Sequence, residues 1–158
     1  MNTKEIPIGV VGLGLMGCSI CTCLLIAGHP VIALAPVSSD LSHAEMRITA
    51  HLKKSMDNRL VENDPDFYLR NLTITEEYAN LSNCQLVIEC TLEDIGIKES
   101  VFGKIEEVIS SEALLTSNTS AIPISVLQKL TKHPERFLGL HWAEPSHTTR
   151  FWKLSVET

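Results

Sequence analysis

The sequence lacks several features that would each indicate a different class of protein. It has no excess of basic residues, because 13 Lys and Arg stand against 19 Asp and Glu, which gives a formal net charge of −6 at pH 7. Such a chain has no overall positive field with which to neutralise a phosphate backbone, so nucleic acid is not an expected partner. It also has no uninterrupted run of the roughly 20 apolar residues that a membrane span needs. No membrane partner is therefore expected.

An even set of cysteines is missing as well. The five cysteines are an odd number in a chain of 158 residues, which is long enough to bury a core without disulfides. We therefore expect a reducing compartment, the cytoplasm. Cys18, Cys21 and Cys23 superficially resemble a metal site, but they lie in an apolar helical run without a second pair of ligands. Buried thiols and no metal are the expectation there.

Short apolar runs alternate with segments of helical periodicity along the chain. Strands are expected at 6–11, 31–35, 72–75, 86–89, 114–117 and 137–141, with a further strand possible at 152–156. Helices are expected at 16–27, from a cap at Ser38 or Asp40 to Met56, at 97–109 and at 124–130, and a polar turn at 62–66. This alternation predicts parallel βαβ units. The fold class is therefore α/β, a Rossmann-type doubly wound and mainly parallel sheet with helices on both faces, with residues 1–158 as one domain.

A glycine-rich loop follows the first predicted strand and opens the first helix. In the segment VGLGLMG, Gly12, Gly14 and Gly17 form the pattern GxGxxG. At this place glycines make the tight turn, admit a pyrophosphate and bring the helix against the strand, while the helix N-terminus offers free N–H groups to the phosphates. A purely structural turn is the alternative. The candidate cofactor-binding residues of this loop are Gly12, Leu13, Gly14, Leu15, Met16 and Gly17.

The end of the second strand departs from the usual dinucleotide pattern. An acidic residue there normally binds the adenosine ribose hydroxyls, but this chain has Ala35, and Asp40 is better placed to cap the next helix. No Arg or Lys follows Ala35 closely enough to indicate a 2′-phosphate site. NAD is the expected cofactor, and NADP is not excluded.

Polar residues follow three later strands, at the edge of the sheet where ligands of open α/β folds bind. They are the cluster Glu89 to Glu93, the cluster Ser117 to Ser120, and His141. A lone histidine is often structural, but imidazole titrates near neutral pH and suits proton transfer beside a nucleotide. The sequence therefore predicts a catalytic site at this edge.

Four ordered blocks, VGLGLMG, VIECTLEDIGIKESVF, TSNTS and RFLGLHW, resemble the NAD-binding domain of the 3-hydroxyacyl-CoA dehydrogenases. The resemblance covers nearly the whole chain. It implies an oxidoreductase of fatty acid metabolism that interconverts 3-hydroxyacyl-CoA and 3-oxoacyl-CoA with a nicotinamide cofactor. It also implies that His141 is the catalytic general base, that Ser120 contacts the substrate oxygen, and that Glu93, Lys98 and Ser120 contact the cofactor, with Asn118 in the same loop.

Other interpretations of these residues remain open. Ser120 can cap the following helix, Glu93 can cap or face solvent, and Lys98 can be a solvated helix residue. Arg47, Lys53 and Lys54 are candidates for contacts with CoA phosphates, or solvated helix charges. The chain as a whole can be a noncatalytic nucleotide-binding or regulatory module, or a dehydrogenase of another small 3-hydroxy acid.

Several positions depart from the family pattern. Glu144 stands where the family has asparagine before proline, and it can interact with His141. The family pairs its histidine with a later glutamate, which falls here at Lys153, Val156 or Glu157 depending on the gap. The family also continues into a helical domain that completes the acyl pocket and mediates homodimerisation, and we expect that domain to be absent from this chain.

Overall fold

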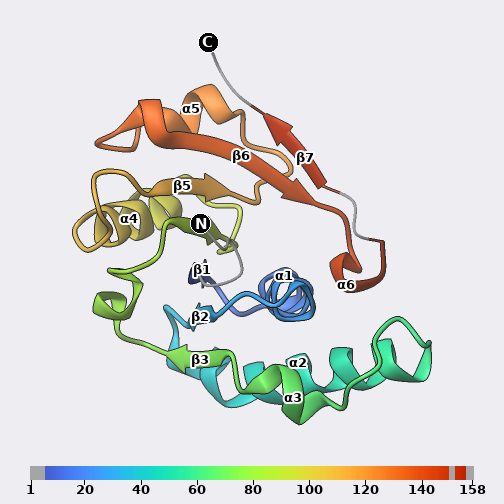
Figure 1. Cartoon of the computed structure of the whole chain (residues 1–158). Coiled ribbons are helices and arrows are strands. Elements are labelled where there is room, and N and C mark those ends of the chain that lie inside the picture. The colour runs from blue at the N-terminus through green and yellow to red at the C-terminus, as the bar shows by residue number, and fades with distance from the viewer. Residues whose placement is uncertain (1–5, 150–151, 156–158) are drawn as a thin grey trace.

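The structure, a computed structural model shown in Figure 1, describes residues 6–149 and 152–155. Its strands are β1 (Ile8–Val11), β2 (Val31–Leu34), β3 (Leu72–Thr75), β4 (Leu86–Glu89), β5 (Leu114–Ser117), β6 (Phe137–Trp142) and β7 (Trp152–Ser155). Its helices are α1 (Leu15–Ala27), α2 (Ser38–Asp57), α3 (Pro65–Leu69), α4 (Ile95–Glu106), α5 (Ile124–Gln128) and α6 (Ser146–Thr149), with the short 3-10 helices η2 (Tyr78–Leu81) and η3 (Pro134–Arg136).

All seven strands form one sheet in the order β3-β2-β1-β4-β5-β6-β7. The first six run parallel to their neighbours, and β7 is antiparallel to β6. The order reverses between β1 and β4, which is the switch point where ligands of doubly wound folds bind. The predicted fold class is therefore confirmed, and the possible strand after residue 151 is present as far as Ser155.

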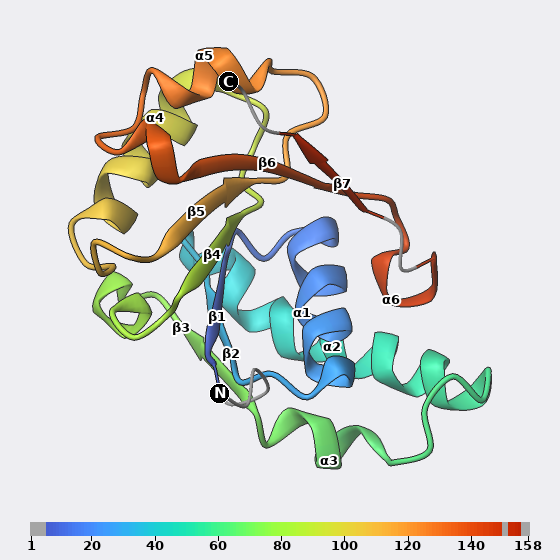
Figure 2. The same cartoon turned by 45° about the horizontal axis from the view of Figure 1, so that its top comes forward.

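Helices cover both faces of the sheet, as Figures 1 and 2 show. α1, α2 and α3 pack on one face, and α4 and α5 pack on the other. Short strands such as β1 are apolar throughout because both faces are buried. α1 is buried almost all round, as its apolar composition predicts, because the sheet, α2, α3 and α6 surround it.

The helix starts differ from the sequence predictions because of capping. Neither Ser38 nor Asp40 caps α2, which follows Val37 and has no side-chain cap. The predicted polar turn at 62–66 instead leads into α3, where Asp64 accepts a hydrogen bond from Phe67 N (3.0 Å). α4 begins before its predicted start because Asp94 caps it, accepting from Ile97 N at 2.9 Å.

Candidate functional site

The carboxyl ends of the central strands are level, so their last residues lie side by side. Val11 of β1 is in register with Glu89 of β4, Glu89 with Ser117 of β5, and Ser117 with Gly139 of β6. His141 lies two residues further along β6. The three polar clusters predicted from the sequence therefore meet at one edge of the sheet.

The glycine loop has the geometry that a dinucleotide phosphate needs. Gly12 has φ +99°, and a Cβ there would lie 2.8 Å from the Cys90 carbonyl oxygen. A Cβ at Gly17 would collide with the Gly12 carbonyl oxygen, whereas a Cβ at Gly14 would have no atom within 4 Å. Gly12 and Gly17 thus allow close packing, and Gly14 leaves open space in front of the loop.

The N-terminus of α1 is free to bind an anion at that open space. The residue before it, Gly14, provides no side-chain cap, and the first turn has no acidic residue. Its first N–H groups carry partial positive charge, which suits a pyrophosphate. Of the other predicted loop residues, Leu15 is exposed and Met16 partly exposed, whereas the Leu13 side chain is fully buried. Leu13 can offer only its backbone to a ligand.

A buried ion pair lies behind the ends of β4 and β5. The Lys98 ammonium donates to both Glu89 carboxylate oxygens at 2.9 Å, with side-chain exposures of 1% and 0%. Glu89 also accepts from Ser117 Oγ (2.6 Å) and from the N–H and hydroxyl of Thr91. These hydrogen bonds compensate the charges for lost water. The interpretation of Lys98 as a solvated helix residue is wrong.

Glu93 joins this ion pair to the loop after β5. Its carboxylate accepts from the backbone N–H groups of Ser120 (2.6 Å) and Ala121 (3.2 Å) and from the Thr119 hydroxyl, and it lies 3.6 Å from Lys98 Nζ. Partial burial alone raises the pKa of the Glu93 carboxyl, but the Ser120 N–H, the Thr119 hydroxyl and the Lys98 charge outweigh it, so the pKa lies below its ordinary value. Glu93 is therefore held as an anion.

Two other predicted residues of the β5 loop are also held in place. The Ser120 hydroxyl donates to Glu93 Oε1 at 3.1 Å. It does not cap α5, which Pro123 precedes without a side-chain cap. Asn118 Oδ1 accepts from Trp142 N at 2.8 Å, which ties the loop to β6. The loop is thus fixed at both ends.

A cleft of about 350 Å³ opens between this loop, the glycine-loop helix and the end of β6. His141 and Ser120 both line it, together with Glu93. Burial raises the pKa of the Cys90 thiol well above its ordinary value, so this neighbour is neutral. The lining residues are Met16, Cys90, Thr91, Glu93, Asn118, Ser120, His141, Trp142, Ala143 and Glu144.

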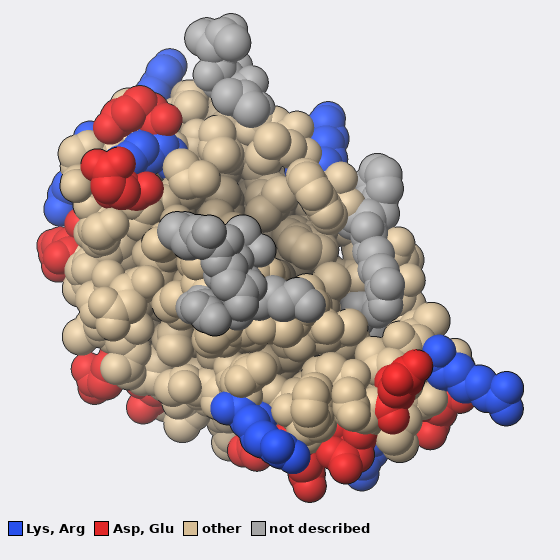
Figure 3. Space-filling model, in the orientation of Figure 1, with Lys and Arg blue, Asp and Glu red and all other residues tan. Residues whose placement is uncertain are grey.

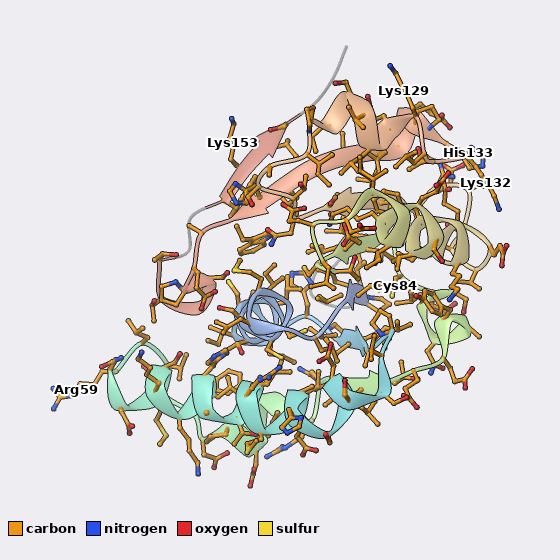
Figure 4. The ribbon with its side chains drawn as sticks, turned by 180° about the vertical axis from the view of Figure 1, so that it is seen from behind. Arg59, Cys84, Lys129, Lys132, His133 and Lys153 are labelled. Atoms are coloured by element: carbon orange, nitrogen blue, oxygen red, sulfur yellow. The ribbon has the colours of Figure 1, made fainter. Side chains whose placement is uncertain are left out.

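Lys153 is one of the three positions at which the family's orienting glutamate could align, and it stands opposite His141 in the β6–β7 register. Figure 4 labels Lys153 on β7. Val156 and Glu157, the alternative positions for an orienting glutamate, lie outside the described residues. Glu144 lines the same cleft as His141, but within residues 6–149 and 152–155 no ion pair joins the two side chains. His141 is exposed and makes no hydrogen bond with any described side chain.

The part of the expected dinucleotide site that lies at the end of β2, which we call the adenosine end, is built differently. Ala35 is 1% exposed and packs into the core with α1 and α2. The half-buried Arg47 of α2 donates from Nη1 to the Leu13 carbonyl oxygen at 3.1 Å. From the sequence, Arg47 was expected to contact CoA phosphates or to be a solvated helix charge, because the separation of residues 13 and 47 along the chain conceals this contact. No local pattern in the sequence would have shown it.

The fold and the cleft define a dinucleotide-binding domain, and comparison with known proteins gives its family. Residues 7–154 match the family "3-hydroxyacyl-CoA dehydrogenase, NAD binding domain". The chain belongs to this family, which confirms the resemblance seen in the sequence.

Individual relatives agree with this membership. A 3-hydroxybutyryl-CoA dehydrogenase of Mycobacterium tuberculosis is 36% identical over 140 residues, which are 87% of this chain and 49% of that protein. The chain thus spans about half the length of the curated relatives it matches. The crystal structure of M. tuberculosis FadB2 has TM-score 0.88 and 35% identity over 93% of this chain and 52% of its own. An Escherichia coli K12 3-hydroxybutyryl-CoA dehydrogenase has TM-score 0.87 and 28% identity over 95% and 32%.

All five cysteines are free. Among the residues that the structure describes, no three His, Cys, Asp or Glu side chains gather as metal ligands would, and no helix is long and apolar enough to cross a membrane. Figure 3 shows Lys and Arg mainly around the rim of one face, interspersed with Asp and Glu.

Proposed function

We propose that this chain is the nucleotide-binding part of an oxidoreductase that interconverts 3-hydroxyacyl-CoA and 3-oxoacyl-CoA. The observation that carries the proposal is a cleft that His141 and Ser120 both line, beside a glycine loop with open space at Gly14. The relatives named as 3-hydroxybutyryl-CoA dehydrogenases support this substrate class. Five free thiols support the cytoplasm as the location.

The residues of the cleft have distinct parts in this proposal. Bound NAD would supply the hydride acceptor. Its pyrophosphate would rest on the N–H groups at the start of α1, with Gly14 allowing close approach. The His141 imidazole would take the hydroxyl proton of the 3-hydroxyacyl group, and would return it in the reverse direction. The Ser120 hydroxyl, which donates to Glu93 Oε1 in the structure, would turn from that carboxylate to donate to the same oxygen.

The hydrogen bonds of Glu93 support this arrangement because they place Ser120 before any ligand binds. Both the N–H and the hydroxyl of Ser120 donate to Glu93, and Glu93 lies beside buried Lys98. We propose that Glu93 faces the cofactor directly, while Lys98 acts through Glu93. Asn118 would serve by fixing the loop to β6.

The decisive experiment measures NADH binding and acetoacetyl-CoA-dependent NADH oxidation, on this chain and on any longer native chain that contains it. We expect NADH binding by both, and poor turnover by the 158-residue chain alone. Gly14→Val should abolish NADH binding in a protein that remains folded, because the new side chain fills the open space. Unchanged NADH affinity in that variant would refute the phosphate-loop assignment.

Two outcomes would favour the other functions. Binding of NADH without turnover by the longer chain, across several 3-oxo substrates, would favour a noncatalytic nucleotide-binding module. Turnover of a free 3-oxo acid in preference to its CoA thioester would indicate a dehydrogenase of another small 3-hydroxy acid.

A further inference from the structure

We infer that Arg47 is a cofactor-selectivity residue that binds the 2′-phosphate of NADPH, so that this chain accepts NADPH as well as NADH. The inference rests on the proposed dinucleotide site. The usual dinucleotide pattern has an acidic residue at the end of β2, where this chain has Ala35. The inference assigns the recognition of the ribose to a residue of α2 instead.

Hydrogen bonds connect Arg47 to the glycine loop and, through that loop, to the end of β2. Its Nη1 donates to the carbonyl oxygen of Leu13, which lies inside the glycine loop. The preceding residue, Gly12, donates from its N–H to the Leu34 carbonyl oxygen at 2.9 Å. Leu34 ends β2 and is followed by Ala35. The guanidinium is therefore tied to the loop segment that adjoins the strand end where a ribose is bound in this fold.

The charge of Arg47 is not neutralised by an ion pair. Among the described residues no carboxylate forms a salt bridge with it. Burial raises the pKa of the Cys18 thiol to about 11; the charge of Arg47 and its hydrogen bond to the thiol oppose that rise, and the charge of Asp40, in the first turn of α2, adds to it. The half-buried guanidinium has five N–H donors, of which the Leu13 carbonyl oxygen takes one and the Cys18 thiol another. The remaining donors suit a phosphate, which Arg binds in a bidentate manner.

The residue that would reject a 2′-phosphate is missing from the same place. Ala35 brings neither a ribose acceptor nor a negative charge, and its methyl group is buried. α2 also begins without a side-chain cap, and of its first N–H groups that of Asp40 donates to the Val37 carbonyl oxygen at 3.0 Å. The N–H groups of Ser38 and Ser39 add partial positive charge there, part of which the Asp40 carboxylate offsets. Compared with the usual NAD-binding pattern, the adenosine end thus has one negative charge fewer and one positive charge more. This difference favours a phosphorylated ribose.

The test is calorimetric titration of the natural chain, Arg47→Met, Arg47→Lys and a control with NADH and NADPH. Arg59→Met is the matched control, because Arg59 follows the same helix and points away from the molecule in Figure 4. The natural chain should bind NADPH within about 10-fold of NADH. Arg47→Met should weaken NADPH by about 10-fold or more, as expected for loss of a charge-assisted hydrogen bond, and NADH by less than about 3-fold.

The remaining variants and outcomes separate a phosphate contact from a structural one. Arg47→Lys should keep part of the NADPH affinity, since it keeps the charge but not the planar fork. Arg59→Met should leave both affinities unchanged. Equal losses for NADH and NADPH in Arg47→Met would overturn the inference, because Arg47 would then serve the pyrophosphate or the loop. Preference of the natural chain for NADH by more than about 100-fold (about 2.7 kcal/mol) would also overturn it, yet leave the proposed function standing. If the natural chain binds neither NADH nor NADPH, both this inference and the proposed function are overturned.

Discussion

The two ends of the proposed dinucleotide site differ in how firmly their polar groups are held. At the ends of β4 and β5, where we propose that the nicotinamide binds and which we call the nicotinamide end, Lys98 pairs with Glu89 and Glu93. Glu93 also bonds to the β5 loop, so these polar groups are held before a ligand arrives. At the adenosine end, the residue that follows β2 is the buried, apolar Ala35, and a hydrogen bond joins Arg47 to the glycine loop. The reacting atoms need fixed geometry, whereas ribose recognition can vary with one or two side chains.

The largest expected effect is at the nicotinamide end, on His141. His141→Gln should lower kcat of the turnover-competent protein by about 10²–10⁴-fold, because the lost function is proton transfer. Dinucleotide affinity should change little. The matched control is His133→Gln, since the His133 side chain is exposed and pairs with Glu135 at the surface. Steady-state kinetics measure the change in kcat, and NADH titration measures the dinucleotide affinity. Normal turnover in His141→Gln would remove this residue from catalysis.

Replacing the basic residues Lys98 and Arg47 should change the free energy of unfolding by different amounts. Lys98→Met should lower the free energy of unfolding by about 3–5 kcal/mol, because it leaves the Glu89 carboxylate buried without its partner. Arg47→Met should cost far less, since no buried charge is orphaned. Urea unfolding of both variants measures the difference. The double variant Glu89→Gln/Lys98→Met should recover part of the loss, and equal costs for the two single variants would contradict the contrast.

Ala35→Asp should make the adenosine end resemble the usual pattern. A carboxylate there would accept from the ribose hydroxyls and repel a 2′-phosphate, so preference should shift towards NADH by about 1–3 kcal/mol. Because Ala35 is buried, the variant should also lose stability. Paired NADH and NADPH titrations are the measurement, with Ala35→Asn as a neutral control. No shift in preference would mean that the ribose is held from elsewhere.

The smallest expected effect concerns pH and Glu93. Its pKa is lowered in the folded protein, so the carboxylate adds stability above the ordinary value of 4.5 and loses that contribution as pH falls through the folded pKa. Glu93→Gln should therefore destabilise the protein at pH 7, and the difference from the natural chain should shrink below pH 4.5. Glu93 is partly exposed, so solvent screening keeps the effect modest. The check is denaturant unfolding at several pH values, with Glu99→Gln on the exposed side of α4 as the control. A pH-independent difference would contradict the charge-based explanation.

Local pattern was sufficient for much of the nicotinamide end. The blocks around Glu93, Ser120 and His141 each end a strand, and parallel strands bring their carboxyl ends to one edge. The roles of Lys98 and Asn118 were harder to predict. Amphipathic spacing does not tell that the Lys98 ammonium is turned inward to Glu89, and nothing in TSNTS shows that Asn118 bonds the backbone of β6.

By itself the sequence determined the order of the strands and of α1, α2, α4 and α5, the glycine loop and the family, because these depend on local periodicity, turn chemistry and ordered blocks of residues. The short helices α3 and α6 were not predicted. The caps of α3 and α4 are local too, although Asp64 and Asp94 were overlooked. Only the tertiary structure decided that Arg47 meets Leu13, that Lys153 stands opposite His141, and that Ala35 is buried. Contacts between residues far apart in the chain depend on how helices pack and strands pair, and a one-dimensional pattern does not contain those distances.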